Sequence, residues 1–346
     1  MMVLLVSVTV LLVIISAAQI LKIAELSAIS KGVKVYEISE KDNRVQAILM
    51  LVFLVFYFAF FAWQYFKWSD LMLPVSASEH GVGVDSLMNV TWLFIIPVFI
   101  VTHILLFWFC FKYAFKTNQK AVFFSHSNKL ELIWTLVPSL ALTVLILYGL
   151  NNWNKIMTPV NPENDHILIE LLGQQFSWGA RYAGEDKKLG RANVNYIEGT
   201  NFMGIDSTDA NCKDDIVVKG EFHIPVNVPV QFVMRSNDVL HSAYMPHFRA
   251  QMNCVPGMKT QFNFVPTITS KEMKKITNNE NFEYLLLCNK ICGAAHYNMQ
   301  MNIVVESKED YDKWLSSQKT FGSSLPNPSE VGALVETQNL KPETIN

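Results

Sequence analysis

The sequence lacks an excess of charge of either sign, an internal repeat, and any long apolar run beyond about residue 165. Its 346 residues hold 28 Lys and Arg against 30 Asp and Glu, a formal net charge of -2. This balance excludes the strongly basic surface of a protein that coats nucleic acid. Cysteine is scarce, with five in the chain. No C-x-x-C-H stretch occurs, which excludes a covalently attached c-type haem.

Hydrophobic residues are abundant, at 51% of the chain against 17% charged residues. An ordinary soluble protein is less apolar, so membrane spans and a polar domain are expected to coexist in this chain. Crossing a bilayer takes about 20 consecutive apolar residues in a helix. Four stretches are long enough, and they lie at 3–21, 46–66, 90–111 and 132–153.

Basic residues in the loops orient these spans. The loops at 22–44 and 112–131 hold five and four Lys or Arg, whereas the loop at 67–86 holds only Lys67. Cytoplasmic loops are enriched in Lys and Arg, so the first two loops are predicted inside and both termini outside. The first span competes with a signal peptide, but it lacks a basic leading segment and exceeds the usual length of about 7–15 apolar residues, which favours a retained helix.

The exported part, about 165–307, has the pattern of a β domain. Short β-branched or aromatic runs such as "DIVVKGEFHIPV" and "MQMNIVVES" are bounded by Pro, Gly, Asn and Asp, which predicts a sandwich or barrel. Residues 183–215 are polar and rich in Gly and Asp, and we expect a long surface excursion there. A short helix is expected around Trp314. The Ser-, Pro- and Glu-rich tail at 317–346 is predicted to be disordered.

The stretch "CNKICGAAHYNM" holds the most specific pattern. Cys288 and Cys292 are followed by His296 and Met299, and a distant "DVLHSAYMP" places His241 at the end of another strand. Alone, a C-x3-C pair in an oxidising compartment favours a disulfide. Two thiolates with two imidazoles and a thioether are instead the ligand set that copper prefers. Zinc rarely takes a methionine.

Two cysteines are more than a single blue copper ion uses, because that site takes one Cys, two His and a weak Met. A second Cys four residues after the first allows both sulfurs to bridge two copper ions. Each ion then keeps one His and one weaker ligand. Such a centre transfers single electrons and needs no open coordination position.

These residues resemble the signature of cytochrome c oxidase subunit II. The family's C-x-E-x-C-G-x-x-H-x-x-M stands here as Cys288, Lys290, Cys292, Gly293, His296 and Met299. Its D-V-L-H-S and V-P-G segments stand in "DVLHSAYMPHFRAQMNCVPG", and its E-x-I-W-T-x-x-P motif stands as "ELIWTLVP" from Glu131 to Pro138. The resemblance covers about 87–316. It implies that two copper ions are held by His241, Cys288, Cys292, His296, Met299 and the backbone carbonyl of Lys290.

The resemblance also implies the fold, a membrane-anchored α plus all-β chain with a cupredoxin-like Greek-key β-barrel. Residues 1–66 would form two extra transmembrane helices with a cytoplasmic loop, and 67–155 the family's transmembrane hairpin. Residues 156–316 would form the copper domain, on the outer side of a bacterial inner membrane.

The implied function is electron transfer in an aa3-type oxidase. Electrons would pass from a c-type cytochrome through the copper centre to haem a of subunit I. That subunit also holds haem a3 and copper B, where oxygen is reduced to water with proton pumping. This chain itself would hold no haem. Subunits I and III and membrane lipid are the implied partners. The two extra helices have no counterpart in the common two-helix subunit II. Either they only face lipid, or they dock a partner such as the alternative complex III with which some bacterial relatives associate.

Two positions depart from the family. The aromatic segment G-H-Q-W-Y-W stands as "GQQFSW", so Phe176 replaces the first tryptophan, through which electrons enter, and Trp178 matches the second. At Lys290 the family has a Glu that binds magnesium at the interface with subunit I. Either this lysine replaces the metal and pairs with acids of subunit I, or it turns to solvent and magnesium stays.

Four other residues have a predicted role. Glu131 matches the family's glutamate where protons enter the K channel, and its plain alternative is a helix N-terminal Glu favoured by the macrodipole. Cys212 and Cys254 are the remaining exported cysteines. A disulfide between them would close a loop of about 40 residues and stabilise by about 3–4 kcal/mol. His103, within the third span, must face protein or water.

Three other functions compete with this reading. A quinol oxidase subunit II shares the fold but lacks the copper ligands, whereas every ligand position is filled here. Nitrous oxide reductase carries a similar copper signature, but on a soluble chain with a large additional domain. A purely structural membrane anchor would not need six convergent metal groups.

Overall fold

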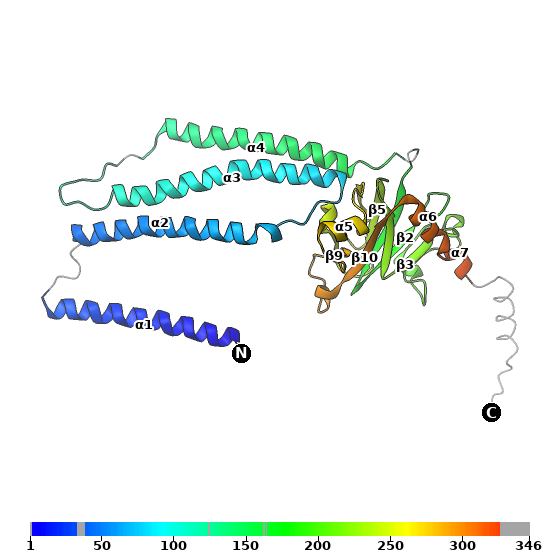
Figure 1. Ribbon diagram of the computed structural model, residues 1–346, viewed down its shortest axis with the longest axis horizontal. Coiled ribbons are helices and arrows are strands. Elements are labelled where there is room, and N and C mark those ends of the chain that lie inside the picture. Colours follow the sequence, from blue (N-terminus) through cyan, green and yellow to red (C-terminus); the bar gives the residue numbers. More distant parts are fainter. Residues whose placement is uncertain (1, 33–38, 124, 162, 164, 326–346) are drawn as a thin grey trace, which may run out of the picture. The chain divides into compact units, whose positions relative to one another are not determined.

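The computed structural model describes residues 2–32, 39–123, 125–161, 163 and 165–325. Four long helices precede a β domain (Figure 1), and they are α1 (Met2–Ser30), α2 (Glu40–Trp68), α3 (Glu79–Lys112) and α4 (Asn128–Met157). A 3-10 turn, η1 (Ser69–Leu71), follows α2. Each of the four helices contains a segment long and apolar enough to cross a membrane. The four predicted spans are therefore confirmed as helices.

The chain divides into two compact units, Met1–Ser69 with Phe94–Leu132, and Asp70–Leu93 with Ile133–Asn346. Within the first unit, aromatic side chains join α2 to α3. The ring of His103 on α3 stacks on Tyr57 of α2, with centroids 5.4 Å apart and planes 17° apart. His103 Nδ1 lies 2.7 Å from the carbonyl oxygen of Phe99. This polar side chain faces protein, as its place within a span predicts.

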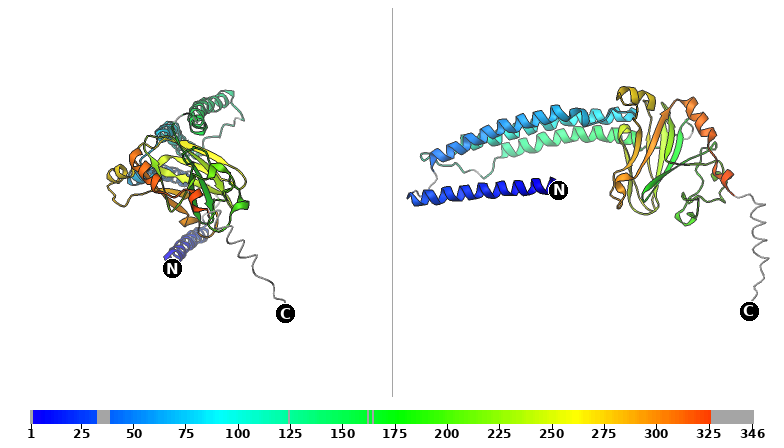
Figure 2. Two further views of the ribbon diagram at one scale, coloured as in Figure 1. Left: turned by 90° about the vertical axis from the view of Figure 1, so that its right-hand side faces the viewer. Right: turned by 60° about the horizontal axis from the view of Figure 1, so that its bottom comes forward.

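Ten strands form the β domain, which Figure 2 shows from two further sides. The strands are β1 (Ile167–Gln174), β2 (Ser177–Tyr182), β3 (Ile216–Lys219), β4 (Glu221–Pro225), β5 (Val230–Ser236), β6 (His241–Met245), β7 (Ala250–Cys254), β8 (Thr260–Phe264), β9 (Tyr284–Cys288) and β10 (Gln300–Glu306). They form two five-stranded sheets, ordered β3-β2-β1-β5-β8 and β4-β10-β9-β6-β7. Pairs β1–β5 and β10–β4 are parallel, and the other named pairs are antiparallel. The predicted sandwich is confirmed.

Short helices complete the domain. They are η2 (Val194–Tyr196), η3 (Ala210–Cys212), η4 (Pro246–Phe248), α5 (Ser270–Ile276), η5 (His296–Asn298), α6 (Lys308–Ser317) and α7 (Phe321–Ser324). The helix expected around Trp314 is α6. Its start is capped by Ser307, whose side chain accepts a hydrogen bond from the backbone N–H of Asp310.

The core lies between the two sheets. Along β5, Val230, Phe232 and Met234 are buried, whereas the residues between them are half-buried, because successive side chains of a strand point to opposite faces. The ring of Phe232 lies 6.1 Å from that of Phe222 on the other sheet. Burying one such side chain stabilises by about 1.5–3 kcal/mol. This alternation is the pattern that predicted the strands.

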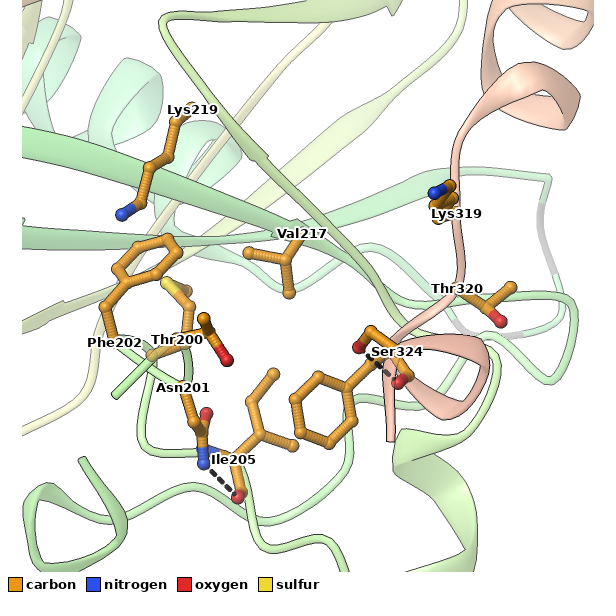
Figure 3. A pocket seen from close by; sticks show the side chains of 11 residues that line it. Thr200, Asn201, Phe202, Ile205, Val217, Lys219, Lys319, Thr320 and Ser324 are labelled. Atoms are coloured by element: carbon orange, nitrogen blue, oxygen red, sulfur yellow. Dashed lines mark hydrogen bonds between the residues drawn. The ribbon is translucent and has the colours of Figure 1, made fainter. Parts of the chain in front are cut away.

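The first sheet is also buried on its outer face, where the excursion at 183–215 covers it. Leu172 of β1 packs there with Met203, Ile205 and Cys212, and we call these four residues the outer cluster. Beside it lies a cavity of about 560 Å³ (Figure 3). The Lys219 ammonium lies over the Phe202 ring at this cavity, 3.6 Å from the ring centroid.

Four buried charged side chains, Glu170, Arg181, Asp215 and Arg235, hold the excursion to the sheet. Arg235 donates two hydrogen bonds to Glu170, of 2.6 and 3.1 Å. Arg181 lies 2.6 Å from Glu170 and 3.1 Å from Asp215. Asp215 also accepts a hydrogen bond of 3.1 Å from the backbone N–H of Gly190, within the excursion. Two cations and two carboxylates thus balance one another without solvent.

The two carboxyl groups respond differently to this burial. Burial by itself would raise the pKa of Glu170, but the charges of Arg181 and Arg235 outweigh it and hold this pKa below its ordinary value. Burial raises the pKa of Asp215 to about 6, because Arg181 and the Gly190 N–H offset only part of the desolvation. The charge of Arg181 therefore stabilises the ionised form of both carboxyl groups.

The predicted disulfide between Cys212 and Cys254 is wrong. Both side chains are free thiols. Cys212 belongs to the outer cluster, whereas Cys254 at the end of β7 belongs to the core between the sheets. The first sheet separates the two environments, because the excursion folds over its outer face instead of returning to β7.

The first part of the tail that was predicted to be disordered, 317–346, is ordered instead. Helix α7 starts at Phe321, whose backbone N–H donates a hydrogen bond of 2.6 Å to the carbonyl of Asp215. The Phe321 side chain packs on the outer cluster, and this apolar anchor orders the segment. Residues 326–346 of the predicted tail lie outside the described residues.

The substitution Arg181→Met tests the buried charges. It removes the one cation that pairs with the Asp215 carboxylate among the described residues, so we expect the free energy of unfolding to fall by about 3–5 kcal/mol. The matched control Lys187→Met breaks an ion pair with Asp165 whose side chains are 50% and 71% exposed, and should cost at most about 1 kcal/mol. Urea titration of the full chain in detergent, followed by tryptophan fluorescence, measures both. Equal losses in the two variants would contradict this account.

Candidate metal centre

The ends of two paired strands and one loop bring the predicted ligands together. His241 is the first residue of β6 and Cys288 the last of β9, and these strands pair antiparallel. The loop after β9 carries Cys292 and His296, and Met299 directly precedes β10. Antiparallel pairing places the start of one strand beside the end of its neighbour. The sandwich therefore gathers these five side chains at one end of the second sheet, where β6 begins and β9 ends.

The donor atoms lie close to one another. Cys288 Sγ is 3.8 Å from His241 Nδ1 and 3.9 Å from Cys292 Sγ. Cys292 Sγ is 3.5 Å from His296 Nδ1 and 3.9 Å from Met299 Sδ. Each sulfur of the pair thus has its own imidazole. The donor atoms of His241, Cys288 and Cys292 all lie within 4.8 Å of one another, and the three side chains are buried.

Lys290 presents its main chain and its side chain differently. Its carbonyl oxygen lies 3.3 Å from Cys288 Sγ, beside the other donor atoms. The residue is exposed, and its ammonium forms no ion pair with any residue in the described part of the chain. The carbonyl can serve a metal ion at this cluster, and the side chain does not crowd it.

Asp238 and Gln175 support the cluster, and the sequence alone did not assign them a role. Asp238 Oδ1 lies 2.7 Å from His241 Nε2, which assigns the ring proton to Nε2 and leaves the Nδ1 lone pair for a metal. Asp238 also accepts a hydrogen bond of 2.7 Å from the backbone N–H of Gln175. The side-chain amide of Gln175 donates to the carbonyl of Cys292 at 2.6 Å. One carboxylate therefore orients the histidine and, through Gln175, connects to the cysteine loop.

These hydrogen bonds keep Asp238 ionised. Partial burial would raise the pKa of Asp238, but the N–H groups of Gln175 and Val239 and the His241 ring hold it below its ordinary value. The sequence offered one clue to this role, the spacing of three residues between Asp238 and His241 within a turn. The contact with Gln175 has no such clue, because 63 positions separate the two residues.

The two predicted aromatic residues lie at different depths. Phe176, in the turn between β1 and β2, is half-buried against the cysteine loop. A Cβ at Gly293 would lie 2.8 Å from the Phe176 ring, and the φ of +138° at Gly293 also favours glycine. Trp178 is buried beneath, with its ring edge-on to His241 and centroids 6.1 Å apart. Phe176 is therefore nearer to solvent.

The donor set fits copper. Burial raises the pKa of Cys292 to about 11, and neighbouring Cys288 adds to the shift. A cysteine binds a metal ion as the thiolate. A bound cation supplies the charge that makes a coordinating thiol lose its proton. Thiolate, imidazole and thioether donors suit copper, whereas hard cations prefer oxygen. Each of the two sulfurs has an imidazole beside it.

Glu131 belongs to the other compact unit, in the first turn of α4. Its Oε1 accepts a hydrogen bond of 3.4 Å from the backbone N–H of Ser127, just before the helix. A carboxylate at this end of a helix is stabilised by the helix dipole. The plain helix-cap role is therefore present, and a role in proton transfer would be additional.

Known families match both parts of the chain. Residues 66–151 match "Cytochrome C oxidase subunit II, transmembrane domain", and residues 167–308 match "Cytochrome C oxidase subunit II, periplasmic domain". The two matches leave α1 and nearly all of α2 outside, where the sequence predicted two extra helices.

Two curated relatives match this chain over most of their own length. An "Alternative cytochrome c oxidase subunit 2" from Bradyrhizobium diazoefficiens is 35% identical over 241 residues, which is 69% of this chain and 81% of that protein. A "Cytochrome c oxidase subunit 2" from Thermostichus vulcanus is 24% identical over 282 residues, or 75% and 82% of the two chains. The solved periplasmic domain of subunit II of cytochrome oxidase from Bradyrhizobium japonicum is 19% identical, with a TM-score of 0.31 over 46% of this chain and 96% of that one.

The substitution Asp238→Asn tests the support of His241. The neutral amide gives up the charged hydrogen bond that orients the ring, so we expect copper affinity to fall about 10–100-fold. Competition with a copper chelator measures this affinity for the full chain in detergent. Asp165→Asn, which changes an exposed carboxylate elsewhere in the domain, serves as the control. An Asp238→Asn variant with unchanged affinity would refute the assigned role.

Proposed function

Because the chain belongs to the cytochrome c oxidase subunit II family, we propose that it accepts electrons from a cytochrome c and passes them to haem a of subunit I. The chain is a subunit of a haem-copper oxidase, and its exported domain is the family's cupredoxin-like periplasmic domain. The proposal adds an aa3-type complex that reduces oxygen to water in subunit I and pumps protons. No haem is assigned to this chain.

The observation that supports this proposal is the pair of buried sulfurs 3.9 Å apart, Cys288 and Cys292, each beside an imidazole. We assign His241, Cys288, Cys292, His296 and Met299, with the carbonyl of Lys290, as ligands of two copper ions. Two copper ions joined by thiolates would exchange single electrons. The chain's own contribution is a fixed donor set, because the β6 and β9 ends and the Asp238 and Gln175 hydrogen bonds hold it in place.

A quinol-oxidising subunit of the same fold is the competing function. Such a subunit lacks the copper ligands, so it would not be expected to bury two thiols beside two imidazoles. In this chain every predicted ligand side chain lies in one cluster. This difference favours the copper centre.

Electrons are proposed to enter beside Phe176. The side chains of Ile291 and Tyr297 are 89% and 88% exposed on the cysteine loop, and Phe176 packs against the same loop at Gly293. Together they offer an apolar surface next to Cys292 for a cytochrome donor. Trp178 lies deeper, with its ring edge-on to His241, and belongs to the same proposed entry route.

Two arrangements are proposed for the magnesium site at the interface with subunit I. In the family the residue at position 290 supplies a carboxylate to that ion, and the ammonium of Lys290 cannot ligate a cation. The exposure of Lys290 leaves it free to pair with an acid of subunit I. Two alternatives therefore remain, a lysine in place of the ion, or an ion held by subunit I alone.

The membrane part supports a multi-pass subunit of the bacterial inner membrane with its copper domain on the periplasmic side. Four helices are long and apolar enough to span, and the Lys and Arg of their loops place the exported domain outside. Subunits I and III are the proposed partners within the oxidase. Contacts such as that of Tyr57 with His103 join α2 to α3, so we assign α1 as the more available helix for alternative complex III.

The substitution Cys292→Ser tests the copper assignment. Loss of one bridging sulfur should reduce bound copper from two ions to about one per chain, and electron uptake from cytochrome c should collapse. Metal analysis and stopped-flow kinetics of the purified oxidase measure the two effects. Cys110→Ser, at an exposed cysteine of α3, is the matched control and should retain both properties. Full copper content in Cys292→Ser would reject the shared-sulfur arrangement.

The substitution Glu131→Gln tests proton uptake. Glutamine keeps a carbonyl oxygen to accept the hydrogen bond from Ser127, so the helix cap persists while the acid is lost. We expect slower reduction of the oxygen-binding site and an unchanged copper spectrum. Reduction of the two haems, followed by rapid-mixing spectroscopy, separates these steps. Wild-type rates in the variant would leave Glu131 with the cap role alone.

A further inference from the structure

A cavity of about 310 Å³ lies where the start of α3 and the end of α4 meet β8. Charged and polar residues line it, among them Glu79, His80, Asn152, Lys155 and Asn263. All of them belong to the second compact unit. None takes part in the metal centre or in proton uptake as proposed above.

The cavity lies at the level of lipid headgroups. The uncharged, mainly apolar stretch of α4 from 132 to 150 is about 28 Å long, which matches a hydrocarbon core of about 30 Å. Lys155 follows about 7 Å beyond its end, within the headgroup layer. Trp153 between them is 52% exposed, and tryptophan is enriched at membrane interfaces. Asn152 donates a hydrogen bond of 3.3 Å to the Gly83 carbonyl, so the start of α3 lies at the same height.

Two opposite charges line this cavity without partners. Glu79 and Lys155 are both exposed, and neither side chain forms an ion pair or a side-chain hydrogen bond with the residues that the structure describes. The nearby Arg249 is already paired with Asp85, at 2.8 and 2.9 Å. The cavity therefore offers one free cation and one free carboxylate, with no net charge.

His80 adds a buried acceptor. Its Nε2 lies 3.4 Å from the carbonyl oxygen of Arg249, a contact that assigns the ring proton to Nε2. Its Nδ1 is buried and has no hydrogen-bond partner among the described residues. The ring therefore lines the cavity beside Glu79, with Nδ1 covered from solvent.

We propose that this cavity binds the headgroup of an ethanolamine phospholipid from the outer leaflet, with its phosphate against Lys155 and its primary ammonium against Glu79. An ammonium with N–H groups can donate charge-assisted hydrogen bonds to the Glu79 carboxylate, whereas a trimethylated choline cannot. An anionic headgroup would meet the Glu79 carboxylate with only one cation to offset it. The bound lipid would join the outer ends of α3 and α4 to β8.

Lipid retention by the full chain tests the proposal, which does not rest on the copper centre. The chain is delipidated in detergent, placed in nanodiscs of phosphatidylcholine mixed with either phosphatidylethanolamine or phosphatidylglycerol, and re-extracted for native mass spectrometry. We expect one retained phosphatidylethanolamine, and at least about tenfold less of the other two lipids, as the loss of one charge-assisted hydrogen bond would give. Equal retention of phosphatidylcholine, or preference for phosphatidylglycerol, would overturn the proposal.

Variants assign the retention to this cavity. Lys155→Gln and Glu79→Gln should each lower it about tenfold, whereas Lys129→Gln, at the opposite end of α4, should not. Gly83→Leu fills the cavity without changing charge and should abolish retention. Gly83→Ala is its control, since a Cβ there meets Asn152 at an ordinary 3.4 Å. Unchanged retention in both charge variants, or equally strong binding of soluble phosphoethanolamine, would refute a lipid site.

Discussion

The burial of two cysteine sulfurs within 3.9 Å of each other is the constraint on which the exported domain depends. The Cys292 thiol resists ionisation, as its raised pKa shows, and a cation among the donor atoms would supply the charge that makes it lose its proton. The surrounding structure holds the donor atoms in place for that charge. Paired strands fix His241 and Cys288, Gly293 lets Phe176 close over the loop, and Asp238 orients the histidine from outside. Each of these supports comes from a different element.

Much of this could be predicted from local pattern. Apolar length identified the four spans, and alternation along runs such as β5 identified the sandwich. The spacing of Cys288, Cys292, His296 and Met299 predicted a cluster, and their side chains do lie together. These features are encoded within a few residues of one another. A resemblance to a known family then supplied the roles that pattern alone cannot give, such as that of the Lys290 carbonyl.

The failures share one physical origin, which is the path of the chain between distant segments. Cys212 and Cys254 lie in sequence where a disulfide is plausible, but the excursion folds over the outer face of the first sheet and leaves both thiols free. The same face orders Phe321 in a tail whose composition predicts disorder. Gln175 reaches Cys292 across 117 positions. Such contacts depend on burial and charge, including the Glu170 and Asp215 pairs with Arg181, which no short motif records.

The electron paramagnetic resonance spectrum of the full chain loaded with copper tests the central claim most directly. Two copper ions that share two thiolates share one unpaired electron after partial reduction. The account predicts a seven-line hyperfine pattern together with two copper ions per chain. A four-line pattern with one copper ion per chain, as a single blue copper site gives, would contradict it.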